Sequence, residues 1–326
     1  MTYKNKLVFL VSLISALAVI YTASVVFNPQ SAGSRSSLYS WLDSKLASKI
    51  SRIEIINSGE SYELSKKNNQ WFVSHNENEY QVDDISSPSE FPARNLRVED
   101  FIGIFTERAL WQTRSSSASS HERLGVDAQN AGRVVFYAEN SVLLDLLFGS
   151  MDVTGNEVYV REYSRNEVRS GNSAAVSYIT GTVNSWYNLR LLAETEDGKI
   201  GVDSVQRLSV YWGDQAQIFT RKNRQWSVSG VYVANPDQSG IDAYVRTVLN
   251  MEGDNFSEEI SAAALESSKD RIVLEFGNGV VKTIFFSEPD EQGRRFANVS
   301  GSEYVYSIAS WAAQRLFKSA ADFEKQ

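Results

Sequence analysis

The sequence predicts an α+β fold in which an N-terminal transmembrane helix precedes two tandem copies of one domain. Three observations support this class: the chain repeats itself over a long period, each copy alternates hairpin-like strands with helices, and an uncharged apolar segment lies near the N-terminus. With 326 residues and 42% hydrophobic content, the chain is long enough to bury two ordinary hydrophobic cores.

The repeat begins in a stretch that aligns without gaps. Arg52 and Trp71 of the first copy correspond to Arg207 and Trp226 of the second copy at one offset of 155 residues. A constant offset of this length indicates duplicated domains, because chance similarity rarely keeps its register.

The similarity resumes further along at a smaller offset. Arg133-Val134-Val135-Phe136 match Arg271-Ile272-Val273-Leu274 at an offset of 138 residues. The shrinking offset indicates that the second copy has lost loops. We therefore place the first domain at residues 50–195 and the second, shorter domain at residues 203–320.

Each copy is predicted to open with a β-meander and to continue with a helix and a second hairpin. In the first copy, alternation and turn composition predict strands over residues 52–56, 62–64, 71–73, 133–137, 142–148 and 157–163. Apolar spacing predicts helices over residues 98–110 and 186–192, with counterparts over 241–249 and 311–317. Because the strands run in hairpins, we expect antiparallel sheets.

The segment from Leu7 to Phe27 carries no charge and is rich in Leu, Val, Ile and Ala. A helix of this length reaches about 30 Å, the thickness of a bilayer's hydrocarbon core. We therefore predict a transmembrane anchor at residues 1–27, with a cleaved signal peptide as the alternative. Lys4 and Lys6 place the N-terminus in the cytoplasm and the bulk outside, which predicts a single-pass protein of the bacterial inner membrane.

Residues 28–49 are predicted to form a linker that contains a short amphipathic helix. Small residues fill the first part of this segment, and Leu38, Trp41, Leu42 and Leu46 then recur at helical spacing. This helix either lies on the membrane surface or packs against the first domain.

Composition and motifs exclude several kinds of chemistry. A net charge of −8 and a pI near 5.1 argue against a nucleic-acid partner. The chain has no cysteine, and it lacks the phosphate-binding patterns GxxxxGK[ST] and GxGxxG. With two histidines, His75 and His121, and no HExxH motif, the sequence predicts no metal site, no cofactor and no catalytic residue.

Trp71 and Trp226 are the candidate binding residues because they occupy corresponding positions in the two copies. Large aromatic side chains usually fill a core or cover a sheet, and the alternative is an exposed platform for a sugar or a peptide. The duplicated pair Trp186 and Trp311 is interpreted in the same way, as packing anchors rather than a ligand cage.

Three other patterns invite a functional interpretation. The serine-rich run before His121 resembles a nucleophile and base, but it also suits a helix N-cap. Residues 152–157 resemble the start of a calcium loop and are better explained as a turn. Glu157 and Glu162 are the paired carboxylates of a hydrolase hypothesis, although their spacing places them on opposite sides of a strand.

The chain resembles the bacterial family named domain of unknown function 4340. The resemblance covers residues 50–195 and rests on segments such as Ser116–Asp127, Leu143–Gly149 and Val158–Arg161. It implies an extracytoplasmic accessory subunit beside an ABC-type export system, with an ABC permease or another envelope protein as partner. The second copy departs from the pattern, because Gly125-Val126-Asp127 has no clear equivalent there.

These observations lead to one functional hypothesis and two alternatives. We expect a non-enzymatic, membrane-anchored module that binds a partner protein or an exported polymer outside the cytoplasm. The alternatives are an envelope hydrolase acting on glycan or peptide, and a sensor that binds a small ligand in a cleft between the repeats.

Overall fold

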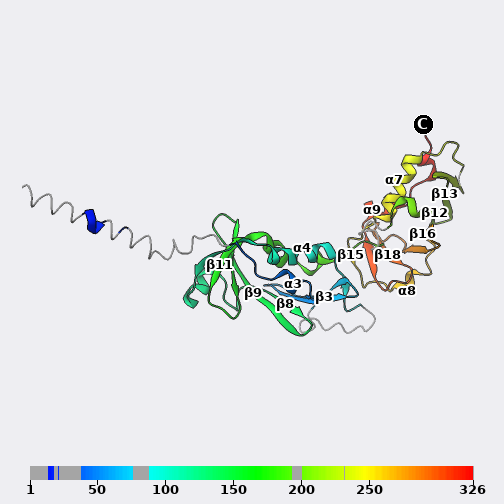
Figure 1. The fold of residues 1–326 in the computed structure, drawn as a ribbon. Coiled ribbons are helices and arrows are strands. Elements are labelled where there is room, and N and C mark those ends of the chain that lie inside the picture. Colours follow the sequence, from blue (N-terminus) through cyan, green and yellow to red (C-terminus); the bar gives the residue numbers. More distant parts are fainter. Residues whose placement is uncertain are drawn as a thin grey trace, which may run out of the picture. The chain divides into compact units, whose positions relative to one another are not determined.

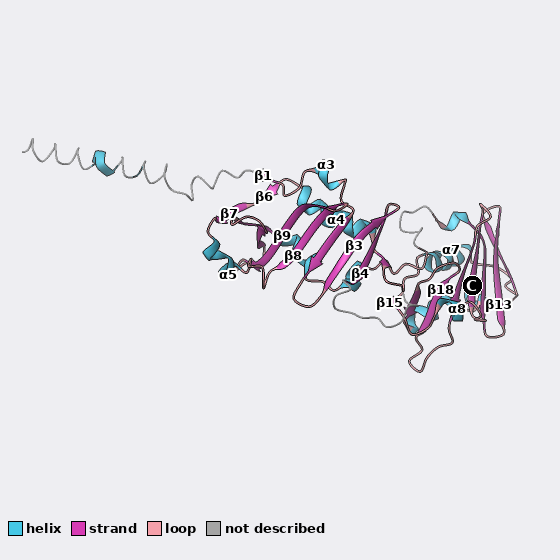
Figure 2. Ribbon diagram, turned by 90° about the horizontal axis from the view of Figure 1, so that it is seen from below, coloured by secondary structure: helices cyan, strands magenta, loops and turns pink. Residues whose placement is uncertain are grey.

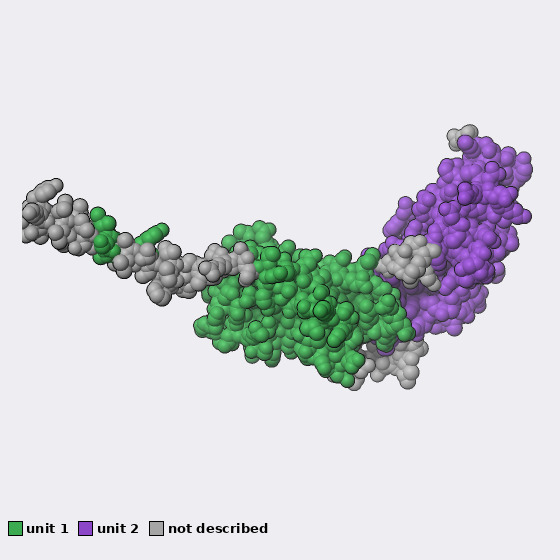
Figure 3. All heavy atoms as spheres, in the orientation of Figure 1, with its two compact units in different colours: residues 1–71, 95–185 green, residues 72–94, 186–326 purple. Residues whose placement is uncertain are grey.

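The computed structural model describes residues 14–17, 21, 38–75, 88–192, 200–230 and 232–325. The chain divides into two compact units, drawn as a ribbon in Figure 1 and as two colours in Figure 3. Unit 1 comprises residues 1–71 and 95–185, and unit 2 comprises residues 72–94 and 186–326. This division differs from the boundaries placed on the sequence mainly because residues 72–94 join the second unit.

Strands dominate the described secondary structure. They are β1 (Leu38–Tyr39), β2 (Arg52–Ile56), β3 (Ser61–Lys67), β4 (Gln70–His75), β5 (Phe91–Pro92), β6 (Ala109–Leu110), β7 (Gln112–Ser115), β8 (Gly132–Ala138), β9 (Ser141–Met151), β10 (Glu157–Glu162), β11 (Val168–Asn172), β12 (Val205–Trp212), β13 (Gln215–Lys222), β14 (Gln225–Ser229), β15 (Asn255–Phe256), β16 (Arg271–Phe276), β17 (Val281–Phe286), β18 (Arg295–Val299) and β19 (Val305–Ile308).

The two large sheets, whose strands are drawn in Figure 2, share one strand order. The first runs β5-β4-β3-β2-β8-β9-β10-β11-β7, and the second runs β14-β13-β12-β16-β17-β18-β19-β15. Apart from the extra edge strand β5, each strand of the first sheet has a counterpart at the same place in the second. The third sheet is the short pair β1-β6, and the ladders are antiparallel.

The predicted α+β class is wrong, because the described residues form three antiparallel sheets with few helices. The sequence pattern missed strands whose stability comes from backbone pairing rather than from alternating apolar residues. Strand β7 has the sequence Gln-Thr-Arg-Ser and is held at the sheet edge by pairing with β11. Such a strand has no hydrophobic periodicity that could reveal it.

The helices are short except for α4 and α7. They are α3 (Ser44–Ala47), α4 (Asn95–Thr106), α5 (His121–Leu124), α6 (Val176–Ile179), α7 (Gln238–Leu249), α8 (Ala262–Leu265) and α9 (Ser310–Leu316), with 3-10 turns η1 (Ala118–Ser120), η2 (Ser173–Ala175), η3 (Val183–Trp186), η5 (Val202–Ser204) and η6 (Ala320–Phe323). The helix predicted over residues 186–192 is wrong, because η3 ends at Trp186 and no helix follows in that range.

The predicted transmembrane anchor is contradicted by the structure. Among the described residues, no helix has the length and apolar character needed to cross a bilayer. A span needs about 20 consecutive residues, and within Leu7–Phe27 only the helical residues 14–17 and 21 are described, while the others lie outside the described residues. The predicted bilayer contact and the single-pass inner-membrane localisation lose their support with it.

The helix predicted within the linker is reduced to the four residues of α3. The Asp43 carboxylate caps it by accepting a hydrogen bond from the Lys45 backbone N–H at 2.8 Å. Trp41 and Leu42 are buried, and the Leu42 N–H donates to the Phe105 carbonyl at 2.9 Å. This segment therefore packs against unit 1.

Tight turns close the corresponding hairpins of both sheets. Asn68 and Asn69 between β3 and β4 have φ values of 49° and 70°, and Asn223 and Arg224 between β13 and β14 have 51° and 65°. Positive φ at both central residues is typical of the type I′ turn, whose twist matches that of the strands. The Asn-rich turn predicted at Lys67-Asn68-Asn69 is therefore found, with a register that fixes Trp71 on the buried face of β4.

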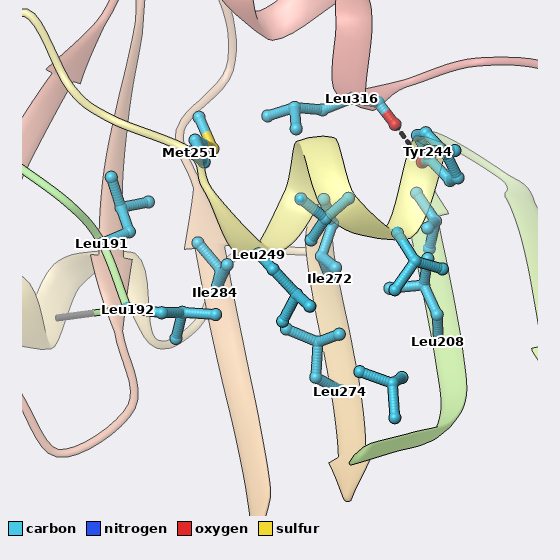
Figure 4. Close-up of a cluster of buried hydrophobic side chains, with 14 of the residues drawn as sticks. Leu191, Leu192, Leu208, Tyr244, Leu249, Met251, Ile272, Leu274, Ile284 and Leu316 are labelled. Atoms are coloured by element: carbon cyan, nitrogen blue, oxygen red, sulfur yellow. Dashed lines mark hydrogen bonds between the residues drawn. The ribbon is translucent and has the colours of Figure 1, made fainter. Parts of the chain in front are cut away.

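A long helix covers one face of each sheet. In unit 1, Phe105 of α4 lies 5.0 Å from the ring of Phe136 on β8 and 5.2 Å from Phe101. In unit 2, α7 packs against the sheet through Leu249, beside Ile272 and Ile284 (Figure 4). Burying each of these side chains stabilises the fold by about 1.5–3 kcal/mol.

Substitution of Gly171 tests the packing of β11 against Trp111. A Cβ at Gly171 would lie 2.4 Å from Cε3 of the indole. Because a buried indole in a packed core cannot move freely, Gly171→Ala should lower the free energy of unfolding by about 1–3 kcal/mol, measured by urea denaturation. Gly201→Ala, whose Cβ meets nothing within 4 Å, should change it by less than about 0.5 kcal/mol; equal stabilities would contradict this packing.

Candidate functional site

A cavity of about 300 Å³ lies in unit 1 between α3, α4 and the β3-β4 hairpin. It is lined by Ser44, Ala47, Ser48, Ile50, Lys66, Trp71, Glu99, Ile102, Gly103 and Thr106. Its wall thus combines one cation, one carboxylate, three hydroxyl groups and an apolar patch. The cavity contains Trp71, one of the two candidate binding residues of the sequence.

Trp71 is fixed by a bond between the hairpin and the helix. Its backbone N–H donates to the Asn95 side-chain oxygen at 2.9 Å, and the Asn95 amide donates to Gln70 Oε1 at 3.0 Å. The first residue of α4 is thereby tied to the first residues of β4. The Lys66 ammonium lies 5.5 Å from the centroid of the Trp71 ring, within the range of a cation–π contact.

The Trp71 indole nitrogen is a buried donor without a hydrogen-bond partner in the described part of the chain. The side chain is 1% exposed. A buried donor left unpaired costs about 1–3 kcal/mol, and most such groups in folded proteins have a partner.

The second repeat builds the same arrangement around Trp226. The Trp226 backbone N–H donates to Gln238 Oε1 at 2.6 Å, and Gln238 is the first residue of α7 as Asn95 is of α4. The Arg221 guanidinium lies 5.6 Å from the Trp226 ring, which corresponds to Lys66 over Trp71. The hairpin, the cation and the helix therefore keep their relation in both repeats.

The two repeats differ in how this tryptophan is satisfied. Trp226 Nε1 donates to Asp242 Oδ1 at 2.7 Å. Asp242 follows Gln238 by four residues on α7, and Glu99 follows Asn95 by four residues on α4. The acidic residue is thus retained, but in the first repeat it leaves the indole unpaired.

The cations differ in the same way. Arg221 donates to Asp203 at 2.7 Å and to the Val202 carbonyl at 3.0 Å. Lys66 forms no ion pair with any described residue, and at the offset of 155 residues Ser48 stands where the second repeat has Asp203. A second cavity of about 600 Å³ borders Arg221, but neither Trp226 nor α7 lines it.

Trp186 and Trp311, the other duplicated tryptophans, are not alike. Trp186 is fully buried, whereas Trp311 on α9 is 62% exposed and lies 5.7 Å from the Arg315 guanidinium. The interpretation as a packing anchor is therefore wrong for Trp311. Trp71 and Trp226 are both buried, so neither ring is an exposed platform. Their role as binding residues stays a prediction.

The segments that carry the family resemblance meet at a structural junction. Gly125 ends α5 with φ of 69°, and a Cβ at Gly149 would lie 2.3 Å from the Leu124 carbonyl oxygen. The buried Arg161 donates to the carbonyls of Val126 and Tyr163 at 3.1 Å and 2.9 Å, and burial lowers the pKa of its guanidinium. These residues hold the α5 loop against the sheet.

The paired carboxylates of the hydrolase hypothesis each have their own partner. Glu157 accepts hydrogen bonds from Ser170 Oγ at 2.5 Å and Arg114 Nη2 at 2.7 Å, and Glu162 pairs with Arg165 at 2.8 Å. The hydrogen bond from Ser170, followed by that from Arg114, holds the pKa of Glu157 below its ordinary value. A general acid needs a raised pKa, so Glu157 is unsuited to that role.

The remaining candidates have local structural roles. His121 begins α5, and its Nε2 lies 3.1 Å from the Asn166 carbonyl oxygen. His75 ends β4. The Asp152 carboxylate accepts hydrogen bonds from the backbone N–H groups of Asn156 and Glu157, both at 3.0 Å, and so closes a turn. The described residues contain no group of three side chains suited to hold a metal ion.

Glu157 should make the stability of the fold depend on pH. Because the pKa of Glu157 is lowered on folding, its stabilisation is complete above the unfolded value near 4.5 and is lost as the pH falls through the folded value. The free energy of unfolding of wild type should therefore exceed that of Glu157→Gln most above about pH 5, and the difference should shrink towards pH 3. A difference that stays constant from pH 6 to pH 3 in urea titrations would refute this.

The second prediction compares the two acidic residues of α4 and α7. Asp242→Ala should lower the free energy of unfolding by about 1–3 kcal/mol, because it removes the acceptor of the Trp226 indole. Glu99→Ala should change it by less than about 0.5 kcal/mol, because the Trp71 indole is not its donor. Urea denaturation of both variants checks this, and equal losses would show that Glu99 also pairs with its tryptophan.

Comparison with known proteins identifies one family. Residues 84–269 match the family described as "Domain of unknown function (DUF4340)", a range that includes α4 and extends through the first half of unit 2. No curated protein matches. Among solved structures, a Eubacterium rectale protein assigned as a DNA polymerase III beta subunit has 6% identity and a TM-score of 0.16, over 84% of this chain and 61% of that protein's chain.

Proposed function

The chain belongs to the DUF4340 family, and we propose that it is a non-enzymatic binding protein whose first repeat takes a small ligand in the cavity beside Trp71. The observation that carries this proposal is the contrast between two equivalent tryptophans. Trp226 donates to Asp242, whereas Trp71 has a buried donor with no partner among the described residues and borders a cavity.

The energetics favour a ligand at this place. An unpaired buried indole N–H destabilises the free protein by about 1–3 kcal/mol. Because the Trp71 nitrogen is buried in the free protein, a ligand oxygen accepts its hydrogen bond and recovers that free energy once the indole turns towards the cavity. A cavity of about 300 Å³ lies at the lower end of the size range of small-molecule sites. The second repeat supplies the internal comparison, since the same hairpin and helix exist there with the acceptor built in.

This proposal narrows the hypotheses drawn from the sequence. The cavity lies inside unit 1 rather than in a cleft between the repeats. The hydrolase alternative loses its assigned residues, because Glu157 and Glu162 are each engaged by an arginine. An ABC permease as partner rests on the family resemblance and stays a prediction.

Fluorine NMR of the full chain labelled with 5-fluorotryptophan tests the proposal. The seven tryptophans give seven signals, and Trp71→Phe and Trp226→Phe assign the two that matter. A library of amino acids, dipeptides and monosaccharides is then added. At least one compound should shift the Trp71 signal saturably and leave the Trp226 signal in place, because Trp71 lines the first cavity and Trp226 does not line the second.

The matched tryptophan makes the outcome decisive. A library that shifts neither signal, or that shifts both equally, would contradict a ligand site in the first repeat.

A further inference from the structure

We propose that the ligand of the Trp71 cavity is a zwitterion, an amino acid or dipeptide with a free ammonium group, a free carboxylate and an apolar side chain. This inference rests on the proposed function and adds the chemical class of the ligand. It follows from the charged side chains, the indole donor and the apolar wall of the Trp71 cavity.

The cavity presents two opposite charges that do not neutralise each other. Lys66 and Glu99 both line it, yet no ion pair joins either of them to a described residue. The Lys66 ammonium nitrogen and the Glu99 carboxylate oxygens are therefore more than 4.0 Å apart, which is too far for an ion pair. A ligand that carries a carboxylate near Lys66 and an ammonium near Glu99 fills that separation and satisfies both charges.

The Trp71 indole adds direction to this recognition. It is a donor and has no acceptor capacity, so it selects an oxygen atom of the ligand. The Lys66 ammonium lies 5.5 Å from the centroid of the indole ring, and the indole nitrogen is buried. One ligand carboxylate therefore serves both groups when the ring turns towards the cavity. The indole and Lys66 thus form the anion-binding side of the cavity, and Glu99 on α4 forms the cation-binding side.

The rest of the wall sets the size and the side chain. Ala47, Ile50 and Ile102 provide an apolar surface, and the position of Gly103 leaves its part of the wall open, since a Cβ there would meet nothing within 4 Å. A volume of about 300 Å³ corresponds to about ten water molecules. This is room for a single amino acid or a small dipeptide with an aliphatic side chain.

The second repeat shows why the same ligand does not bind twice. Arg221 is already paired with Asp203, and the Trp226 indole is already paired with Asp242. Both groups that would meet a ligand carboxylate are occupied by side chains of the protein. Zwitterion binding is therefore expected once per chain.

Calorimetric titration with three probes tests this inference. L-leucine carries both charges, L-leucinamide lacks the carboxylate, and N-acetyl-L-leucine lacks the ammonium. We expect saturable binding of L-leucine with one site per chain, and at least about tenfold weaker binding of each derivative, since each leaves one charged group unmatched.

Two substitutions assign the charges. Lys66→Met should weaken L-leucine to the level of L-leucinamide and leave L-leucinamide itself unchanged. Glu99→Gln should weaken L-leucine to the level of N-acetyl-L-leucine and leave the acetylated probe unchanged. The neighbouring substitutions Lys67→Met and Asp100→Asn make the same changes in net charge outside the cavity lining, and they should bind L-leucine as wild type does.

The outcomes separate this inference from the function on which it rests. Equal affinity for the three probes, or loss of binding in Lys67→Met as large as in Lys66→Met, would overturn the zwitterion assignment. If a monosaccharide shifts the Trp71 fluorine signal and none of the leucine probes binds, the zwitterion is wrong and the cavity is still a ligand site. If no compound shifts that signal, both proposals fail.

Discussion

The bond that ties the β-hairpin to the long helix is the constraint on which each repeat depends. In both repeats the backbone N–H of a buried tryptophan donates to the side-chain oxygen of the helix's first residue, Asn95 or Gln238. This bond fixes the start of the helix over the sheet, and with it the position four residues later, where Glu99 and Asp242 stand. With the same placement, the first repeat has an unpaired indole beside a cavity and the second has an internal pair.

The two repeats share this scaffold and differ in the partners of the tryptophan indole and of the neighbouring cation. The second repeat satisfies its tryptophan and its cation internally, through Asp242 and Asp203. The first keeps Lys66 and Trp71 beside a cavity, with an indole donor that has no partner among the described residues. Stability given up at one place while the fold is otherwise conserved is typical of a functional site.

The sequence predicted those parts of the fold whose signals are local. The duplication paired Trp71 with Trp226, and asparagines marked the turn before Trp71, where φ is positive at two successive residues. The sequence did not predict strands that depend on tertiary pairing. Polar strands such as β7 form because a neighbouring strand pairs with them, so the class was wrongly predicted as α+β. The apolar N-terminal segment suggested an anchor by length and composition alone, and the described helices provide no span.

For the site, the sequence indicated Trp71 but not its neighbours. Lys66 could have been found, because the offset of 155 residues pairs it with Arg221 beside the duplicated tryptophan. Glu99 could not be paired with Asp242 in the same way, since the loop between hairpin and helix differs in length and shifts the offset. That Trp71 lacks an acceptor and Trp226 has one is a matter of side-chain geometry, which no spacing in the sequence reveals.

A crystal structure of the full chain soaked with L-leucine is the measurement that tests the central claim most directly. The account predicts density between Lys66 and Glu99 for a molecule whose carboxylate accepts a hydrogen bond from Trp71 Nε1, with Trp226 bonded to Asp242 in the same crystal. A first repeat in which the Trp71 indole donates to Glu99 and closes the cavity, as Trp226 does to Asp242, would contradict it.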